Sequence, residues 1–178
     1  MRLLLHICCG PCAIYPIKEL TNSRFKEIVG YYYNPNIHPP SEYKKRKNAL
    51  RDAENNIGFK VIYPAYKIEE YFRKVASKED SPQRCGLCWE LRLRETACFA
   101  KKNGFNAFTT TLLISPYQDH EIIKELSETI AKDEGIEFYY RDFRKGFRAS
   151  QEDAKKIDMY RQKYCGCVFS ELERVKMK

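Results

Sequence analysis

The sequence contains no apolar run long enough to cross a bilayer. Its opening MRLLLHICCGPC has a short apolar stretch, but no secretory core followed by a small-residue cleavage site. We therefore expect a protein with no membrane segment, located in the cytoplasm, where thiols stay reduced. In that compartment the eight cysteines indicate metal or redox chemistry rather than a disulfide scaffold.

The common phosphate-binding loops are also missing. The sequence has neither GxGxxG nor GxxxxGK[ST], which argues against an ordinary nucleotide enzyme. The position of such a loop, after the first expected strand, is occupied by CCGPC. There are no repeats, low-complexity tracts or linker-like stretches, so we expect one domain over residues 1–178.

The charge balance favours a polyanionic partner. Lys and Arg number 32 against 24 Asp and Glu, giving a net charge of +8. The basic residues gather with aromatic or apolar neighbours in YKKRKNALR, YFRK and RDFRKGFR. Such clusters can hold phosphates while rings stack on unpaired bases, which favours RNA. The alternative for each cluster is an ordinary solvated helix face.

Expected strands alternate with expected helices along the whole chain. The strands are expected at 2–8, 27–34, 59–66, 105–115 and 136–143. The helices are expected at 12–23, 41–56, 68–80, 87–104, 117–135 and 150–164, with a short helical tail. Pro16 is expected in a first helical turn, Ser41 as a helix cap and Gly58 as a helix end. This alternation predicts an α/β fold, a three-layer Rossmann-like parallel sheet covered on both faces.

The predicted fold places distant segments together. Parallel α/β sheets bind ligands at the carboxyl ends of their strands. Cys8 and Cys9 end the first strand, residues 34–36 follow the second, and residues 109–116 lie toward the end of the fourth. We expect these segments to meet at one edge of the sheet.

Two groups of cysteines suggest a metal centre. Cys85 and Cys88 form a CxxC before a helix, a spacing shared by zinc, redox-dithiol and iron–sulfur sites. Cys8 and Cys9 are adjacent, and because neighbouring side chains diverge they suit two irons of a bulky cluster better than one small zinc site. Together these residues match the Cys₄ requirement of a [4Fe–4S] cluster. A tetrahedral zinc site is the alternative.

The remaining cysteines differ in character. Cys165 and Cys167 flank a glycine, and such a pair can close only a small, strained and easily reduced disulfide. Free thiols or further metal ligands are the alternatives. Cys12 lies near the first pair and is a candidate ligand of an additional metal. Cys98 falls within an amphipathic helix and is expected in the core.

For the other polar residues the sequence gives weaker evidence of a functional role. Asp119 and His120 are candidate proton donors, but we favour the simpler interpretation that they begin a helix. His6 is expected to be buried in the first strand, and His38 either contacts RNA or shapes a Pro-rich loop. The three tyrosines at 31–33 are expected to pack within a strand.

Five motifs together identify a resemblance that covers nearly the whole chain: HICCGPC, YYYNPNIHPPSEYKKR, RCGLCWELRL, FTTTLLISPYQDH and YRQKYCGCVFS. With these motifs the sequence resembles the epoxyqueuosine reductase family that does not use cobalamin. The resemblance implies reduction of the epoxide of epoxyqueuosine to the cyclopentene of queuosine at the tRNA wobble position. It also implies an α/β fold of the adenine-nucleotide α-hydrolase kind (HUP-type) without its phosphate loop.

The resemblance also implies site residues and partners. The positions that match the family's cluster ligands are Cys8, Cys9, Cys85 and Cys88, and those that match its redox-active disulfide are Cys165 and Cys167. An additional mononuclear iron is expected for the family, with Cys12 as the first choice of ligand. The expected partners are tRNA carrying epoxyqueuosine and an unidentified electron donor. From their position beside the CxxC, Arg84, Arg92 and Arg94 are candidates to contact tRNA phosphates or to tune the cluster, with ordinary surface solvation as the alternative for each.

The expected reaction needs a cofactor. Converting an epoxide to an alkene takes up two electrons and two protons and releases water, and no side chain supplies low-potential electrons. Two other functions compete. One is tRNA sulfur transfer on paired cysteines, which would usually require an ATP-binding loop. The other is a zinc-stabilised RNA-binding domain without enzymatic activity.

Overall fold

The structure, a computed structural model, describes residues 1–176, apart from the side chains of residues 56 and 57. Its centre is a five-stranded sheet in the order β3-β2-β1-β4-β5, in which every neighbouring pair is parallel. The strands are β1 (Arg2–His6), β2 (Glu27–Tyr31), β3 (Lys60–Ile62), β4 (Ala107–Thr110) and β5 (Glu137–Phe138). This order is that of a Rossmann-like, doubly wound sheet.

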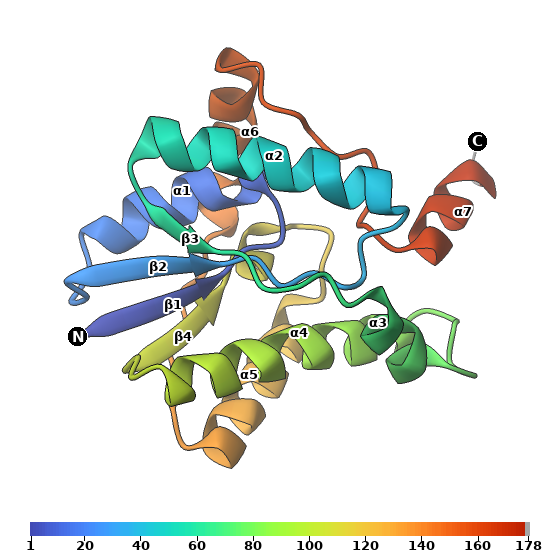
Figure 1. The fold of residues 1–178 in the computed structure, drawn as a ribbon, viewed down its shortest axis with the longest axis horizontal. Helices are drawn as coiled ribbons and strands as arrows, with labels where there is room; N and C mark the ends of the chain where they lie inside the picture. Colours follow the sequence, from blue (N-terminus) through green and yellow to red (C-terminus); the bar gives the residue numbers. More distant parts are fainter. Residues whose placement is uncertain (177–178) are drawn as a thin grey trace.

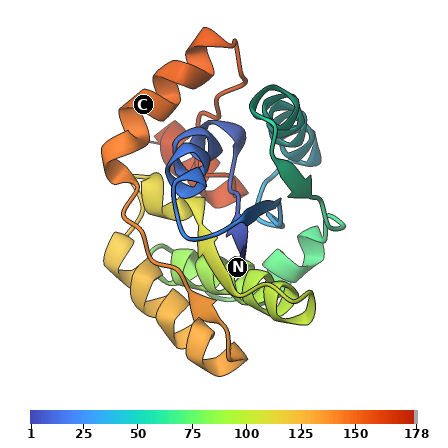
Figure 2. The same ribbon diagram turned by 90° about the vertical axis from the view of Figure 1, so that its left-hand side faces the viewer.

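Helices cover both faces of the sheet, as Figures 1 and 2 show. One face carries α1 (Gly10–Thr21), α2 (Pro40–Ile57) and α6 (Phe147–Lys156). The other carries α3 (Ile68–Val75), α4 (Gln83–Lys102) and α5 (His120–Glu134). Two 3₁₀ turns, η1 (Thr111–Ile114) and η2 (Arg144–Gly146), and the terminal α7 (Val168–Lys176) complete the described elements. The predicted three-layer α/β class is confirmed.

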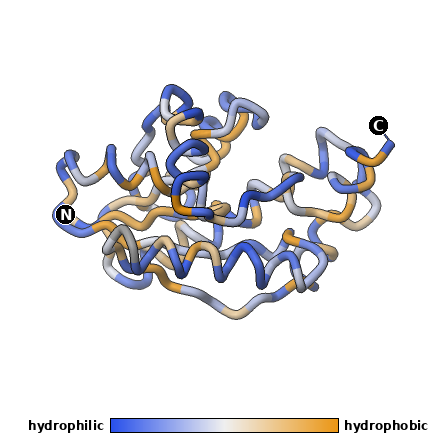
Figure 3. Tube along the Cα trace, turned by 90° about the horizontal axis from the view of Figure 1, so that it is seen from above, coloured by the Kyte–Doolittle hydropathy of each residue, from blue (hydrophilic) through white to orange (hydrophobic). Residues whose placement is uncertain are grey.

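Strand β1 lies in the middle of the sheet and of the core. Leu3, Leu4 and Leu5 are fully buried, and β1 pairs with β2 on one side and β4 on the other. The apolar strands run through the centre of the hydropathy trace in Figure 3. Burial on both faces explains why β1 is a continuous apolar run rather than an alternating one. It also places the residues after His6 at the centre of the sheet's carboxyl edge.

Several strands are shorter than predicted. Strand β4 ends at Thr110, whose hydroxyl accepts a hydrogen bond from the backbone N–H of Leu112 and starts η1. The predicted strand over 105–115 is therefore wrong after residue 110. This side-chain turn competes locally with the sheet ladder, which the apolar pattern does not reveal.

Helix α1 begins at Gly10, so Pro16 lies inside the helix rather than in its first turn. A proline inside a helix cannot donate a backbone hydrogen bond. The hydroxyl of Ser150 braces the same stretch, because it accepts from Tyr15 N at 3.1 Å and donates to Pro11 O at 2.6 Å. A residue of α6 thus supports the irregular first half of α1.

Other helix ends differ from the prediction in ways that matter for the site. Helix α2 is capped by Pro39 rather than Ser41, whereas Gly58 ends it with the expected left-handed φ of 74°. Helix α4 begins at Gln83, so Cys85 is helical and not in a loop. The last long helix ends at Lys156, which leaves an irregular segment before α7. Within residues 1–176, no helix combines the length and apolar character needed to span a membrane.

Candidate metal centre and active site

The three segments predicted to meet at the carboxyl edge of the sheet do so. After β2, Asn34 donates from Nδ2 to the carbonyl oxygen of Ile7 at 2.8 Å. After β4, the Thr111 hydroxyl accepts from the N–H of Cys8 at 3.0 Å and donates to its Sγ at 3.2 Å. Both side chains fix the backbone immediately after β1, where the first cysteines lie.

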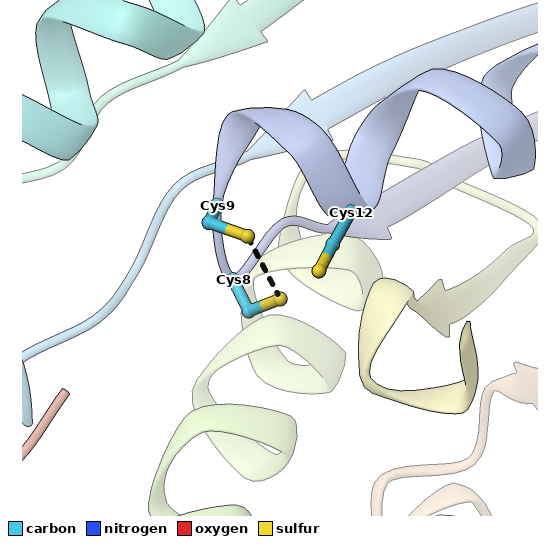
Figure 4. Close-up of side chains that lie close together, drawn as sticks. All are labelled: Cys8, Cys9 and Cys12. Atoms are coloured by element: carbon cyan, nitrogen blue, oxygen red, sulfur yellow. Dashed lines mark hydrogen bonds between the residues drawn. The ribbon is translucent and has the colours of Figure 1, made fainter. Parts of the chain in front are cut away.

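Cys8, Cys9 and Cys12 form a compact group of sulfurs. All three Sγ atoms lie within 4.8 Å of one another, and those of Cys8 and Cys9 are 3.9 Å apart. Cys9 caps the N-terminus of α1 and Cys12 lies in its first turn, so the sulfurs face a common point (Figure 4). Helix N-terminal amides favour negative charge, which suits thiolate ligands.

In this group the thiolate form is favoured at Cys8, and the protonated thiol form at Cys9 and Cys12. Hydrogen bonds from Cys12, Cys9 and the Thr111 hydroxyl hold the pKa of Cys8 well below its usual value. Burial raises the pKa of Cys9, and the hydrogen bond to Cys8 raises the pKa of Cys12. Metal binding replaces such protons, so this is a donor set that a soft metal can occupy.

Cys85 and Cys88 line a second cavity, of about 300 Å³, together with Cys165 and Cys167. Cys85 is partly exposed, with its Sγ 3.6 Å from the hydroxyl of Ser81. Cys88 is buried, and burial raises its pKa to about 12 although the nearby guanidinium of Arg92 opposes the shift. The mid-chain pair therefore faces the cysteines near the C-terminus.

Arg92 connects the two sulfur groups. It lines both the second cavity and a larger one, of about 530 Å³, that contains Cys8 and Cys12. Tyr117, Gln118 and Cys165 also line both cavities. The compact group contains Cys12 but neither member of the mid-chain pair. Since a four-iron cluster is much wider than one ion, its ligands are expected to face one another across a space rather than to touch.

The second cavity has polar groups that need a partner. Tyr71 Oη, Arg84 Nε and Arg92 Nη2 are buried hydrogen-bond donors with no acceptor among the described residues, and all three residues line it. Buried donors without partners cost free energy. A sulfide-rich, anionic group would accept hydrogen bonds from them, so the residues present fit an iron–sulfur cluster.

The Cys165-Gly166-Cys167 segment is held by the loop that precedes α2. Cys165 is exposed, Cys167 is buried, and both are free thiols. His38 donates from its backbone N–H to Gly166 O at 2.8 Å, and its carbonyl accepts from the hydroxyl of Tyr164. Gly166 has a φ of 150°, and an added Cβ would lie 3.1 Å from Asn36 Nδ2. Glycine is thus required both for conformation and for close approach.

Arg46 is the main support of this segment. Its guanidinium is buried, pairs with Glu42 at 2.7 Å, and donates to Cys165 O at 2.9 Å and Tyr164 O at 3.1 Å. The interpretation of YKKRKNALR as a surface basic cluster is therefore wrong for Arg46. The signal that could have revealed it is Glu42, one helical turn earlier on the same face.

The three arginines around the CxxC have different surroundings. Arg94 is bound to Asp133 and Glu134 of α5 and lines neither cavity. Arg84 lines the second cavity and pairs with Glu173 of α7 at 2.9 Å. Arg92 is the one placed between the two groups of cysteines.

A further basic cluster, RDFRKGFR, is partly neutralised by acidic neighbours: Arg141 binds Glu19 and Arg144 binds Asp142.

The remaining candidates are mainly structural. Asp119 caps α5 by accepting from Ile122 N at 3.1 Å, and buried His120 follows it, which confirms the helix-start interpretation. His38 is buried and braces the Pro-rich loop, with Nε2 3.1 Å from Pro35 O. Buried strand positions are confirmed for His6 and Tyr31, whereas Tyr32 and Tyr33 are buried but lie beyond the end of β2. Cys98 is only partly buried, so its assignment to the core is wrong.

Three polar residues at the site had no role in the sequence analysis. Besides Thr111, Gln162 donates to Cys9 Sγ at 2.9 Å, and Gln118 donates to Cys165 Sγ at 3.7 Å while accepting from Trp89 at 2.8 Å. All three lie inside the quoted motifs FTTTLLISPYQDH and YRQKYCGCVFS. Their position inside these motifs was the signal available in the sequence.

Comparison with known proteins gives consistent matches along the chain. A profile of the family described as "Epoxyqueuosine reductase QueH" matches residues 3–173. The relative of that name in Dehalococcoides mccartyi is 42% identical over 174 residues, covering 97% of this chain and 94% of the relative. The one in Thermotoga maritima is 37% identical over 180 residues, covering 97% and 91%. A solved structure, described as a predicted subunit of tRNA methyltransferase from Methanocaldococcus jannaschii, aligns with a TM-score of 0.49 and 13% identity over 87% of this chain and 74% of that one.

Proposed function

The chain belongs to the epoxyqueuosine reductase QueH family, and from this premise we propose that it reduces the epoxide of epoxyqueuosine at the tRNA wobble position to the cyclopentene of queuosine. It is an oxidoreductase that acts on tRNA. The reaction is the last step of queuosine formation. Because tRNA and reduced thiols are both found there, the cytoplasm is its proposed compartment.

The observation that carries the proposal is the meeting of cysteines from both ends of the chain. Cys8 and Cys12 line one cavity, Cys85 and Cys88 line the next, and Cys165 lines both. A protein that only bound RNA would have no need to gather thiols around adjoining cavities. Sulfur transfer also loses support, because family membership assigns a reductase.

We assign the metal ligands as follows. The proposed ligands of a [4Fe–4S] cluster are Cys8, Cys9, Cys85 and Cys88. Cys12 is the proposed ligand of an additional iron, because its sulfur already lies beside those of Cys8 and Cys9. When bound, an iron–sulfur cluster supplies electrons at low potential, which side chains do not.

The chain's own residues supply reducing equivalents and orientation. Oxidation of the thiols of Cys165 and Cys167 to a disulfide releases two electrons and two protons, the number that epoxide reduction to alkene and water consumes. An external reductant must then return the disulfide to thiols. Gln118 orients the sulfur of Cys165, and Arg46 holds the backbone of the pair.

The test is anaerobic purification followed by an activity assay. Brown protein with iron and acid-labile sulfide, which converts epoxyqueuosine-containing tRNA to queuosine-containing tRNA, is the expected result. Failure of reduced, iron-loaded protein to form queuosine would refute the proposal. Colourless protein with zinc alone that retains RNA affinity would favour the binding-domain alternative.

The redox pair has a separate test. Cys167→Ser is expected to keep its iron but to slow turnover with a physiological reductant, because the disulfide can no longer form. If this variant turns over as fast as the unsubstituted protein, the Cys165-Gly166-Cys167 segment has only a structural role.

A further inference from the structure

The larger cavity extends from the cysteines to the surface. Its volume of about 530 Å³ is bounded by η1, the start of α6 and the segment before α7. At the inner end is Cys12, which is 5% exposed, and at the outer end is Tyr117, which is 83% exposed. Cavities of roughly 300–1,000 Å³ are typical of small-molecule sites, so this one can hold a single nucleotide.

The charged side chains that line this cavity are all positive. Arg92, Arg161 and Lys163 line it, and no Asp or Glu of the described chain does. Arg161 and Lys163 are exposed, whereas Arg92 is buried and its Nη2 has no partner. A concave surface with cations and no carboxylates attracts an anionic ligand. Phosphates near the outer end would meet the two exposed cations.

Tyr117 supplies an aromatic surface at the outer end. Its ring contacts Phe147 nearly perpendicularly, with 5.8 Å between centroids and an angle of 83°, so Phe147 does not stack on it. Single exposed aromatic residues are common on protein surfaces and by themselves indicate nothing. Here the ring stands beside cations at the entrance to a cavity that leads to reactive sulfurs, which is the combination used to bind unpaired bases.

We propose that this cavity binds the epoxyqueuosine nucleotide itself, with Tyr117 stacked on its base and Arg161 and Lys163 contacting the adjoining phosphates. The inference rests on the proposed function and adds the substrate-binding site to it. The wobble nucleotide lies in a single-stranded loop, so it can leave its neighbours at small cost. The modified end of the base then points inward, toward Cys8 and Cys12.

The experiment measures RNA binding separately from chemistry. Iron-loaded protein is titrated anaerobically against an anticodon stem-loop RNA that carries epoxyqueuosine, and the Kd is read by fluorescence anisotropy. Tyr117→Ala is expected to weaken binding roughly 5- to 150-fold, and Tyr117→Phe to bind like the unmodified protein, because the ring supplies the interaction. Tyr140→Ala is the control, since Tyr140 is also partly exposed but lies outside the cavity.

The outcomes separate this inference from the function on which it rests. An unchanged Kd for Tyr117→Ala, with iron content and melting temperature also unchanged, would overturn the nucleotide site even if queuosine is formed. Conversely, Tyr117-dependent binding without any queuosine would refute the proposed reaction and leave the binding site standing. Loss of binding by Tyr140→Ala to the same degree as by Tyr117→Ala would also overturn the assignment.

Discussion

Arg92 donates a hydrogen bond from Nε to the backbone carbonyl oxygen of Cys88, one helical turn earlier on α4, at 3.2 Å. The bond draws the guanidinium back toward the CxxC. Burial by itself would lower the pKa of Arg92, but the surrounding sulfurs, chiefly those of Cys88 and Cys165, raise it. A buried cation without an acidic partner is costly unless an anionic group faces it. The cysteine centre is that group.

Replacing this cation should change the reduction potential of the proposed iron–sulfur centre. Arg92→Gln removes a positive charge, which stabilises the more oxidised, less negative state. The midpoint potential is therefore expected to fall by roughly 50–100 mV, as an estimate for one charge at short range in a protein interior. An anaerobic redox titration followed by electron paramagnetic resonance measures the shift.

Two further variants test whether charge is the cause. Arg92→Lys keeps the charge and should recover most of the potential. Arg94→Gln, on the same helix but paired with α5, should leave it unchanged. Equal potentials for the unmodified protein and Arg92→Gln would show that the guanidinium does not act on the centre.

Removing Cys88 should remove the metal. Cys88→Ala is expected to lose most of its iron and sulfide together with activity, because one ligand of the proposed cluster is removed. Iron analysis after anaerobic reconstitution checks this. Cys98→Ala is the matched control on the same helix, since Cys98 lines neither cavity. Full iron content in Cys88→Ala would exclude Cys88 from the ligands.

Arg46 should be important for stability as well as for the position of the redox pair. Arg46→Met leaves Glu42 buried without its counter-charge, which is expected to lower the free energy of unfolding by about 3–5 kcal/mol. Arg46→Lys retains the charge but loses the forked contact with both carbonyls, so its loss should be smaller. Chemical denaturation measures both values. Amide exchange at residues 164–167 should rise in Arg46→Lys; unchanged exchange would contradict the bracing role.

The close contact between Gly146 and α1 gives a stability prediction away from the cysteines. A Cβ at this position would lie 2.1 Å from the ring of Tyr15, so Gly146→Ala must displace the ring or the backbone. The expected cost is about 1–3 kcal/mol. Gly86→Ala is the control, because nothing lies within 4 Å of the added atom and alanine is favoured in a helix. Similar unfolding free energies for the two variants would refute the steric argument.

The layered fold and the meeting of the segments that follow β1, β2 and β4 could be predicted from the sequence for one physical reason. A short buried strand followed by a helix implies a parallel sheet, and the carboxyl ends of parallel strands share one edge. Cys8 follows the central strand and Thr111 the end of its neighbour, so their contact follows from topology alone. No knowledge of side-chain packing was needed.

Contacts that depend on packing between distant segments could not be predicted in this way. Arg46 resembles its exposed neighbours in sequence, and only the docking of the segment before α7 buries it. The turn signal at Ser81-Pro82 predicts a loop around Cys85, yet α4 starts directly after this signal. Likewise, the CCGP turn signal concealed the start of α1 at Gly10.

The bond between Gln162 and Cys9 joins residues 153 positions apart. A ribosome makes Cys9 long before Gln162, so the side of the site that Gln162 closes stays open until residue 162 has been made. We therefore expect the proposed iron site to be completed only after residue 162 has been synthesised. A variant that ended before residue 162 would leave the sulfur of Cys9 without this bond.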